Sequence, residues 1–273
     1  MSSLKHTLRD ALVTGAIHSG IANTVRKRAR AQGPLLRILC LHDVPDRAWF
    51  GELITLCTER YRMVSPEQAT KGELDSDRIN ILCTFDDGYQ SWTDVVAPVL
   101  AEHTVKGLFL ITSGLLDCPS EEEVRTFFRE RLRLNTFRAP LSWDGARVLI
   151  DAGHTIGAHT RTHADLIRCT ESDAREEMTR DRARIQEELG AKIEWFAYPF
   201  GTPSHHAPAL DAIAKAVGFT YTVTTVPGFA PPLASVPNAI PRTQLEWQQP
   251  LQSVAHWIEG GYDPVYRLNR SCR

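Results

Sequence analysis

Short apolar runs alternate with amphipathic stretches along the chain from residue 37 onward, and this alternation limits the folds that the chain can adopt. Apolar runs separated by helical segments are typical of parallel strands joined by crossover helices. The predicted strands cover residues 37–42, 81–85, 107–111, 155–158, 195–198, 219–223 and 239–243. Seven such runs predict an α/β fold in which the sheet forms a barrel or a partly open barrel.

Two of the helices between these strands are marked by their ends. Residues 171–189 are rich in Glu, Arg and Ala and end at Gly190, and residues 208–217 end at Gly218. Glycine commonly follows the last helical turn, because it adopts the left-handed backbone conformation without strain. Both segments are therefore predicted to be crossover helices.

Residues 118–140 fit the alternation poorly, since a charged helical stretch is followed there by a loop. We interpret them as an insertion at the mouth of the barrel, where loops commonly shape access to a site. No linker divides the chain. We therefore expect one domain over residues 36–273, preceded by an N-terminal extension at residues 1–35.

Length and composition are those of an ordinary globular protein. The chain has 273 residues, of which 42% are hydrophobic, enough to fill the core of one sizeable domain. Lys and Arg number 31 against 33 Asp and Glu, so the net charge of -2 gives no reason to expect a nucleic acid partner. The six cysteines form no CxxC pair, which predicts free thiols rather than a disulfide framework.

The N-terminal segment is where a targeting or membrane sequence is expected. It lacks the strong apolar core of a signal peptide, and no stretch of the chain reaches the roughly 18 to 20 apolar residues of a membrane span. We therefore expect a cytoplasmic protein. Apolar residues nevertheless recur at helical spacing ahead of a basic run, which indicates a helix packed on the outside of the domain or peripheral contact with the inner membrane surface. These positions are Leu4, Leu8, Leu12, Ile17 and Ile21.

Two adjacent carboxylates, Asp86 and Asp87, follow the apolar run 81–83 within the sequence TFDDG. Carboxylates at the end of a buried strand destabilise the fold unless a cation compensates them, and a metal ion is the simplest such cation. Active-site residues also gather at this end of the strands in a β/α barrel. The alternative is a strand-ending turn in which the carboxylates only cap a helix.

Two histidines, His159 and His163, follow the strand-like run 155–158. Four residues apart, they point to one side if the segment turns helically, which is the spacing of many zinc sites. A lone His-x-x-x-His pair is weak evidence. Because the aspartates and the histidines both lie at ends of predicted strands, together they predict an Asp-His-His metal site with open positions for water and substrate.

A third strand-to-turn sequence, FAYPFG at residues 196–201, completes a pattern. With TFDDG at 84–88 and HTRTH at 159–163, it resembles in order and spacing the motifs of the polysaccharide deacetylase family, also called the NodB-homology domain or carbohydrate esterase family four. The resemblance spans residues 36–245, and its opening Leu41-His42-Asp43 is similar to the Tyr-His start of the branch that deacetylates poly-N-acetylglucosamine. It implies a distorted (β/α) barrel and a catalytic role for the domain.

The resemblance also implies a role for each residue of the site. Asp86 is the general base, whereas Asp87, His159 and His163 hold a divalent metal. Zinc is the first expectation because the ligands are one carboxylate and two imidazoles, and cobalt, nickel and iron are alternatives. The main-chain N–H of Phe200 is the expected donor to the oxyanion. The expected substrate contacts are Tyr89, Tyr198 and Phe200, with Trp143 and Trp247 as further aromatic candidates.

The sequence departs from the family pattern in two places. The Tyr198-Pro199-Phe200 run lacks the arginine that usually orients the catalytic aspartate, and no Leu-x-His sequence occurs near the C-terminus to supply a general acid. Arg242 is the candidate replacement, because closing a barrel brings the last strand beside the first strands and their Asp86 loop. A surface arginine on an edge strand is the alternative. His42, at the end of the first strand, is the next candidate for a catalytic role.

These features predict a metal-dependent N-deacetylase that removes acetyl from an N-acetylated amino sugar. The expected substrate is nucleotide-linked, lipid-linked or an oligosaccharide, and the absence of an export signal favours a precursor of an O-antigen or capsule-type polymer. A related amide hydrolase, such as a deformylase acting on a lipid-linked amino sugar or a ring-opening amidohydrolase, is the first alternative. A carbohydrate-binding pseudoenzyme is the second.

Overall fold

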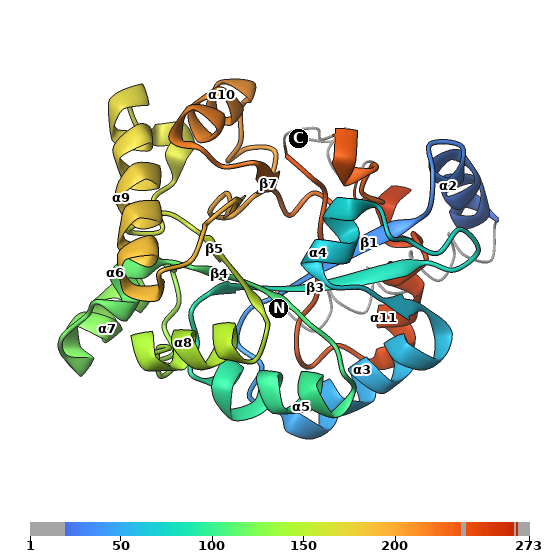
Figure 1. Cartoon of the computed structure of the whole chain (residues 1–273), viewed down its shortest axis with the longest axis horizontal. Coiled ribbons are helices and arrows are strands. Elements are labelled where there is room, and N and C mark those ends of the chain that lie inside the picture. The colour runs from blue at the N-terminus through green and yellow to red at the C-terminus, as the bar shows by residue number, and fades with distance from the viewer. Residues whose placement is uncertain (1–19, 236–238, 265, 267–273) are drawn as a thin grey trace.

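The computed structural model describes residues 20–235, 239–264 and 266. One sheet organises this part of the chain, and all its strand pairs are parallel (Figure 1). In spatial order the strands are β7 (Tyr221–Val223), β6 (Trp195–Ala197), β5 (Thr155–Ala158), β4 (Leu108–Ile111), β3 (Asn80–Asp87), β1 (Leu36–Leu41) and β8 (Thr243–Gln244). A two-residue strand that the sequence did not predict, β2 (Arg62–Met63), also pairs with β3. The predicted α/β barrel fold is confirmed.

The last strand segment brings the two edges of the sheet together. Ile240 pairs with Val223 of β7, and β8 pairs with Leu39 and Cys40 of β1. Pro241, which has no N–H to donate, separates these two pairings. The strand predicted at 239–243 is therefore shorter and later than expected, because the proline divides the segment between two neighbours.

Helices surround the sheet, and five of the ten α-helices in the described residues begin at a side chain that caps the first turn. Thr170 caps the long helix α9 (Glu171–Leu189) by accepting a hydrogen bond from the N–H of Asp173 at 3.2 Å, and Gly190 ends it with a φ of 61°. The other α-helices are α2 (Ile21–Arg30), α3 (Arg47–Arg60), α4 (Pro66–Lys71), α5 (Ala97–Glu102), α6 (Ser113–Leu116), α7 (Glu121–Glu130), α8 (Trp143–Asp151), α10 (Pro208–Val217) and α11 (Leu251–Ile258). Both helices predicted from their glycine ends, α9 and α10, have the predicted bounds.

The core has two parts because alternate residues of each strand point to opposite faces of the sheet. Ile81, Cys83 and Phe85 of β3 join the larger cluster, which packs beneath the outer helices. Leu82 belongs to a smaller cluster with residues of β1, β4, β6 and β7. Leu82, Thr84 and Asp86 are alternate residues of β3 and therefore share one face of the sheet. This alternation directs the Asp86 carboxylate toward the inside of the curved sheet.

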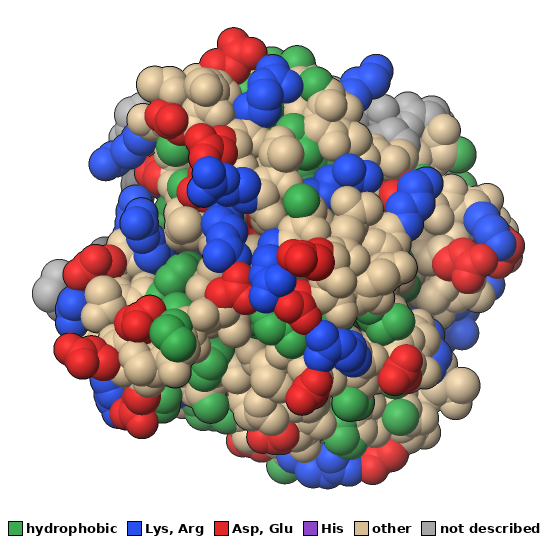
Figure 2. Space-filling model, turned by 60° about the vertical axis from the view of Figure 1, so that its left-hand side comes forward, with side chains coloured by type: hydrophobic (Ala, Val, Ile, Leu, Met, Phe, Trp, Pro, Cys, Tyr) green, Lys and Arg blue, Asp and Glu red, His purple; other side chains and the backbone are tan. Residues whose placement is uncertain are grey.

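One outer side of the molecule, formed around α9, is a solvated charged surface. Figure 2 shows basic and acidic side chains intermixed on this side. Arg184 of α9 lies 3.1 Å from Asp117 and 2.6 Å from Glu188, and Arg147 of α8 reaches the same glutamate at 2.6 Å. Asp117 and Glu188 are half-buried, and Glu188 links α8 to α9 through Arg147 and Arg184.

The N-terminal extension is described only in part. The apolar positions predicted between residues 4 and 17 lie outside the described residues. α2 follows them, with Ala22 buried and Arg26 contacting Glu259 beyond α11 at 3.1 Å. No helix within the described ranges has the length and apolar character needed to cross a membrane. The five described cysteines are free thiols, as predicted.

Candidate functional site

The two aspartates of the TFDDG sequence end β3, opposite Leu110 and Ile111 of β4. Asp86 and Asp87 are 1% and 3% exposed, so both carboxylates are removed from bulk water. Asp87 has a φ of 84°, and Gly88 after it has a φ of 123°. Residues other than glycine rarely adopt this φ, and a Cβ at Gly88 would also lie 2.8 Å from a methyl carbon of Leu116, so the tight turn that separates the directions of the two carboxylates favours glycine there.

The two histidines converge on Asp87, but through a backbone that differs from the predicted one. The segment after β5 is not helical, because Thr160 and His163 adopt left-handed φ values of 68° and 53°. The Nε2 atoms of His159 and His163 each lie 3.5 Å from Oδ1 of Asp87. Two left-handed residues, rather than one helical turn, therefore bring the imidazoles to the same point.

The donor atoms of this cluster fit a divalent metal. Oδ1 of Asp87 is buried and has no hydrogen-bond partner within the described part of the chain, although buried oxygens normally have one. Nδ1 of His159 lies 2.8 Å from the carbonyl of Ala197, and Nδ1 of His163 lies 3.2 Å from that of Arg131. A carbonyl can only accept a hydrogen bond, so Nδ1 carries the proton in each neutral imidazole and Nε2 keeps a lone pair for a cation.

Electrostatics keep Asp87 and His163 in the protonation states that a metal requires. Burial raises the pKa of Asp87, but the surrounding histidines outweigh burial and hold this pKa well below its usual range. Burial lowers the pKa of His163 to about 4, so its imidazole is neutral near pH 7. Burial also lowers the pKa of His159, but the hydrogen bond to Asp87 and the charges of both aspartates more than reverse this and raise it. An ionised carboxylate beside a neutral imidazole is the form in which these side chains bind metals.

Asp86 is paired with Arg242. The guanidinium donates from Nη1 to Oδ1 and from Nη2 to Oδ2, both at 2.6 Å, and from Nη1 to Thr84 at 2.9 Å. Arg242 is 0% exposed, so the alternative of a surface arginine on an edge strand is wrong. Burial raises the pKa of Asp86, and the charge and hydrogen bonds of Arg242 more than reverse this, leaving the pKa below its usual value.

The location of Arg242 follows from the closure of the sheet. It lies between Ile240, which pairs with β7, and Thr243, which pairs with β1. Its Nε donates to the carbonyl of Thr224 just after β7, at 2.9 Å. The guanidinium therefore reaches across the inside of the sheet to β3, as expected if the closing segment meets the first strands.

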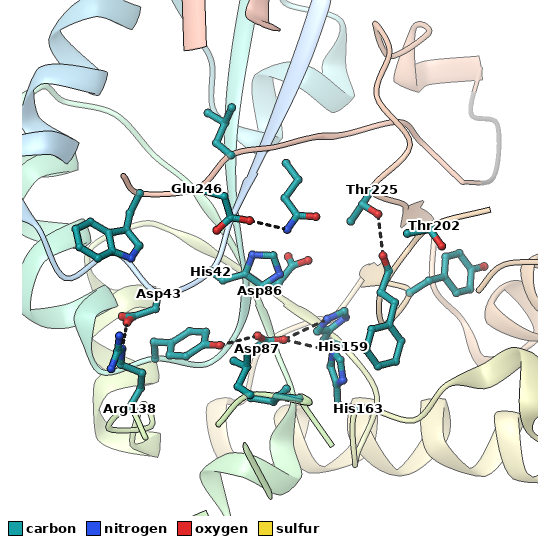
Figure 3. A pocket seen from close by; sticks show the side chains of 18 of the residues that line it. His42, Asp43, Asp86, Asp87, Arg138, His159, His163, Thr202, Thr225 and Glu246 are labelled. Carbon is teal, nitrogen blue, oxygen red and sulfur yellow. Dashed lines mark hydrogen bonds and ion pairs between the residues drawn. The ribbon is translucent and has the colours of Figure 1, made fainter. Parts of the chain in front are cut away.

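A cavity of about 500 Å³ opens over both aspartates (Figure 3). His42, at the end of β1, projects into it beside Asp86. The predicted insertion contributes Leu132, Leu134, Thr136 and Arg138 to the lining, and the segment after β8 contributes Leu245, Glu246 and Trp247. The loops that follow the strands therefore form the walls, while the strand ends form the floor.

The predicted aromatic contacts divide into three groups. Tyr89 and Tyr198 line the cavity, but their hydroxyls donate to Asp87 at 2.9 Å and to Asp211 at 2.7 Å. The ring centroid of Phe200 lies 4.8 Å from that of His163. Trp143 lies instead on α8, where its Nε1 donates to Asp117 at 2.8 Å.

Several lining residues were assigned no role from the sequence. Asp43 and Arg138 form an ion pair of 2.7 Å at one wall, and Glu246 lies at another (Figure 3). Asp43 and Glu246 each lie within two residues after a strand, which is the signal that could have identified them. Arg138 has no such signal, because its position depends on how the insertion folds back over the cavity.

Comparison with known proteins agrees with this geometry. Residues 74–222, more than half of the chain, match the family model for polysaccharide deacetylase. The chain belongs to the polysaccharide deacetylase family. The match includes both aspartates and both histidines of the site, whereas His42 and Arg242 lie outside it.

Solved structures share the fold of this member of the family. IcaB from Ammonifex degensii superposes with a TM-score of 0.67 at 24% identity, covering 84% of this chain and 99% of that one. The Streptococcus pyogenes deacetylase PplD, solved in complex with acetate, gives a TM-score of 0.64 at 18% identity, covering 82% and 97% of the two chains. The uncharacterized protein YlxY of Bacillus subtilis is 24% identical over 193 residues. That match covers 70% of this chain but 46% of YlxY, so the chain spans about half the length of this relative.

Proposed function

We propose that this protein is a metal-dependent N-deacetylase that removes acetyl from an N-acetylated amino sugar in a glycan or glycan precursor. One observation carries the proposal. The buried oxygen Oδ1 of Asp87, without a hydrogen-bond partner in the described residues, faces two imidazole Nε2 atoms, directly beside a second carboxylate that an arginine keeps ionised. Metal-assisted hydrolysis of an amide needs this combination of a cation site and a base.

Asp87, His159 and His163 would hold the cation. A divalent cation at this position would polarise the acetamide carbonyl and make a water molecule more acidic. Zinc suits one carboxylate and two imidazoles best, and cobalt, nickel or ferrous iron are compatible with the same set. Tyr89 would hold Asp87 in the binding orientation through the other carboxylate oxygen.

Asp86 would act as the general base. Arg242 donates to both of its oxygens, and the Cys40 thiol also donates to Oδ2 at 3.4 Å. The second lone pair of Oδ1 would therefore take the proton from the attacking water. Arg242 would keep the carboxylate ionised and fix its orientation without contacting the substrate. It would therefore be a positioning residue rather than a catalytic one.

His42 would donate a proton to the departing amine, and the proton that Asp86 took from water would then pass to His42. A ring nitrogen of His42 lies within 4.8 Å of both the Asp86 carboxylate and the Cys40 thiol, so it borders the cavity at the base. The main-chain N–H of Phe200 would stabilise the negative charge on the former carbonyl oxygen. Phe200 and Trp247 line the cavity, and we propose them as aromatic surfaces for the sugar ring.

We further propose that the substrate is a nucleotide-linked, lipid-linked or short oligomeric precursor of a cell-surface polysaccharide, met in the cytoplasm. The family supports an acylated carbohydrate as the substrate class. PplD, one of the structural relatives, is named a deacetylase and was solved with acetate, the acid that this reaction would release.

The experiment is to incubate the metal-loaded protein with N-acetylated sugar nucleotides, lipid-linked sugars and chito-oligomers, together with the N-formyl analogue of each. Acids and sugar products would be measured by mass spectrometry. Acetate release that disappears in Asp86→Asn is the expected result. Formate release alone would assign a deformylase instead. Saturable sugar binding without turnover, in protein that holds its metal, would overturn the enzyme assignment.

A further inference from the structure

A second cavity, of about 330 Å³, lies at the opposite end of the barrel from the proposed active site. Tyr61 and Ile79 in its lining directly precede β2 and β3, so the cavity opens at the amino ends of strands whose carboxyl ends carry the aspartates. Four arginines line it, namely Arg26, Arg30, Arg60 and Arg78. The acids in the lining are Asp77 and Glu259, so four positive charges against two negative ones leave an excess of two.

Three separate segments bring these arginines together. Arg26 and Arg30 are four residues apart on α2 and therefore share one face of the helix. Arg60 is the last residue of α3, and Arg78 lies in the turn before β3. Segments distant in the chain thus converge on one cavity, and local sequence composition does not account for the cluster.

Glu259 compensates only part of this charge. Nη1 of Arg26 lies 3.1 Å from one oxygen of the carboxylate, and Nη2 of Arg60 lies 3.5 Å from the other. The hydroxyl of Tyr61 also donates to the carboxylate, at 3.2 Å. One carboxylate is therefore shared between two guanidinium groups and a phenol.

Arg30 and Arg78 are held by main-chain carbonyls instead. Arg30 donates to the carbonyls of Ser76 and Asp77, the latter at 2.6 Å. Arg78 donates to the carbonyl of Tyr61 and, at 3.4 Å, to that of Glu59. Among the described residues neither guanidinium has a carboxylate within ion-pair distance. Carbonyl dipoles orient these groups but leave their net charge in place.

We propose that this cavity is a binding site for a phosphate group, separate from the deacetylase site. Guanidinium groups fixed by carbonyls are preorganised donors, and their planar geometry matches the oxygens of phosphate. A bound phosphate would compensate the two excess charges. The phosphate belongs either to a soluble phosphorylated compound or to the headgroup of an anionic phospholipid. In the second case the active site, at the other end of the strands, faces away from the bilayer.

The first test is calorimetric titration of the full chain with inorganic phosphate at constant ionic strength. We expect saturable binding of one phosphate per chain, weakened at least about tenfold in the double variant Arg30→Gln/Arg78→Gln, because charged hydrogen bonds to phosphate are lost. The matched control is Arg125→Gln/Arg129→Gln on α7, where both arginines are exposed and paired with glutamates. It removes the same charge and should bind phosphate as the unmodified protein does.

The second test separates the two sources of phosphate. Sedimentation with vesicles of phosphatidylcholine, with and without phosphatidylglycerol, shows the lipid source if binding requires phosphatidylglycerol and is lost with Arg30→Gln/Arg78→Gln. Phosphate binding in calorimetry without vesicle binding shows the soluble source. The proposal is overturned if neither probe binds in a way that depends on Arg30 and Arg78, provided that the variants melt at the temperature of the unmodified protein. Acetate release in the variants reports separately on the proposed function.

Discussion

Arg242 binds both carboxylate oxygens of Asp86 at 2.6 Å, although the two residues are 156 positions apart in the chain. Both side chains are buried, at 0% and 2% exposure. A buried aspartate without this partner would have a raised pKa and would accept a proton at a higher pH. The pair therefore determines the pH range over which the proposed base is ionised.

Replacing Arg242 by Lys should move the acidic limb of the kcat/KM profile to higher pH. Burial raises the pKa of Asp86 and Arg242 lowers it, so a weaker partner lets the pKa rise and the base is lost at a higher pH. The rate should fall while the metal content stays the same.

Arg242→Ala should shift the profile further and destabilise the protein by about 3–5 kcal/mol, since a buried charge loses its partner. Thermal melting measures the second effect. Profiles that remain unaltered in both variants would place Arg242 outside the site, and His42 would then be the next residue to test as the partner of Asp86.

Metal content should distinguish the two neighbouring aspartates. The purified protein should hold about one divalent metal per chain, and Asp87→Ala, His159→Ala and His163→Ala should each abolish binding, because each removes one of three ligands. Asp86→Asn should keep the metal while the rate falls at least about a hundredfold, the usual scale of general-base catalysis. Elemental analysis and turnover measure both. Stoichiometric metal in all three alanine variants would refute the ligand assignment.

Tyr89→Phe should weaken metal binding by about 10–100-fold, because the hydroxyl that orients Asp87 is lost. The ring contacts with Trp92 and Phe128 remain, so the melting temperature of the metal-free protein should change little. Tyr198→Phe is the matched control, since its hydroxyl donates to Asp211 rather than to Asp87. Competition with a chelating dye measures the affinity, and equal affinities in the two variants would contradict the role of Tyr89.

His42→Gln should lower acetate release from an N-acetyl sugar about a hundredfold without changing metal content, if His42 protonates the amine. An aryl acetate ester whose phenolate leaves without protonation should be hydrolysed at nearly the normal rate by the same variant. The ratio of the two activities is the measurement. An equal loss on both substrates would show that His42 acts on binding or on Asp86 instead.

His154, away from the catalytic cavity, should make the fold sensitive to acid. Burial, followed by the charge of Lys106, lowers its pKa from 6.5 to about 4, and its Nδ1 accepts a hydrogen bond from the N–H of Gly107. Between pH 4 and pH 6.5, His154 is protonated in the unfolded chain but neutral in the folded chain. The contribution of His154 is therefore complete above pH 6.5 and is lost as the pH falls toward 4.

The upper limit of this effect is about 3.4 kcal/mol, at roughly 1.36 kcal/mol per pKa unit, and partial solvent screening reduces it. His154→Asn keeps an acceptor near the position of Nδ1 but does not titrate. Urea unfolding at pH 7 and pH 5 should show a smaller loss of stability in the variant. Equal losses would mean that other groups determine the acid sensitivity.

Local chemistry made several elements predictable. The strand at 155–158 and the helices at 171–189 and 208–217 have the bounds predicted from apolar runs and terminal glycines. Apolar runs and terminal glycines are local features of the sequence, so they can be recognised without knowledge of the fold. The two-residue β2 carries too little pattern to be detected, and Pro241 divided the last predicted strand in a way that depends on its two neighbours.

The sequence by itself determined which residues are available at the strand ends, including the two aspartates and the two histidines, because their positions follow from strand periodicity. Only the tertiary structure decided which atoms meet. The imidazoles converge through left-handed residues that no propensity indicates, and Tyr89 turns to Asp87 instead of to the substrate space. Arg138 reaches Asp43 because an insertion folds back, and Arg242 reaches Asp86 because the sheet closes. Such contacts depend on the separation of distant segments in space, which pairing and packing of the whole sheet establish.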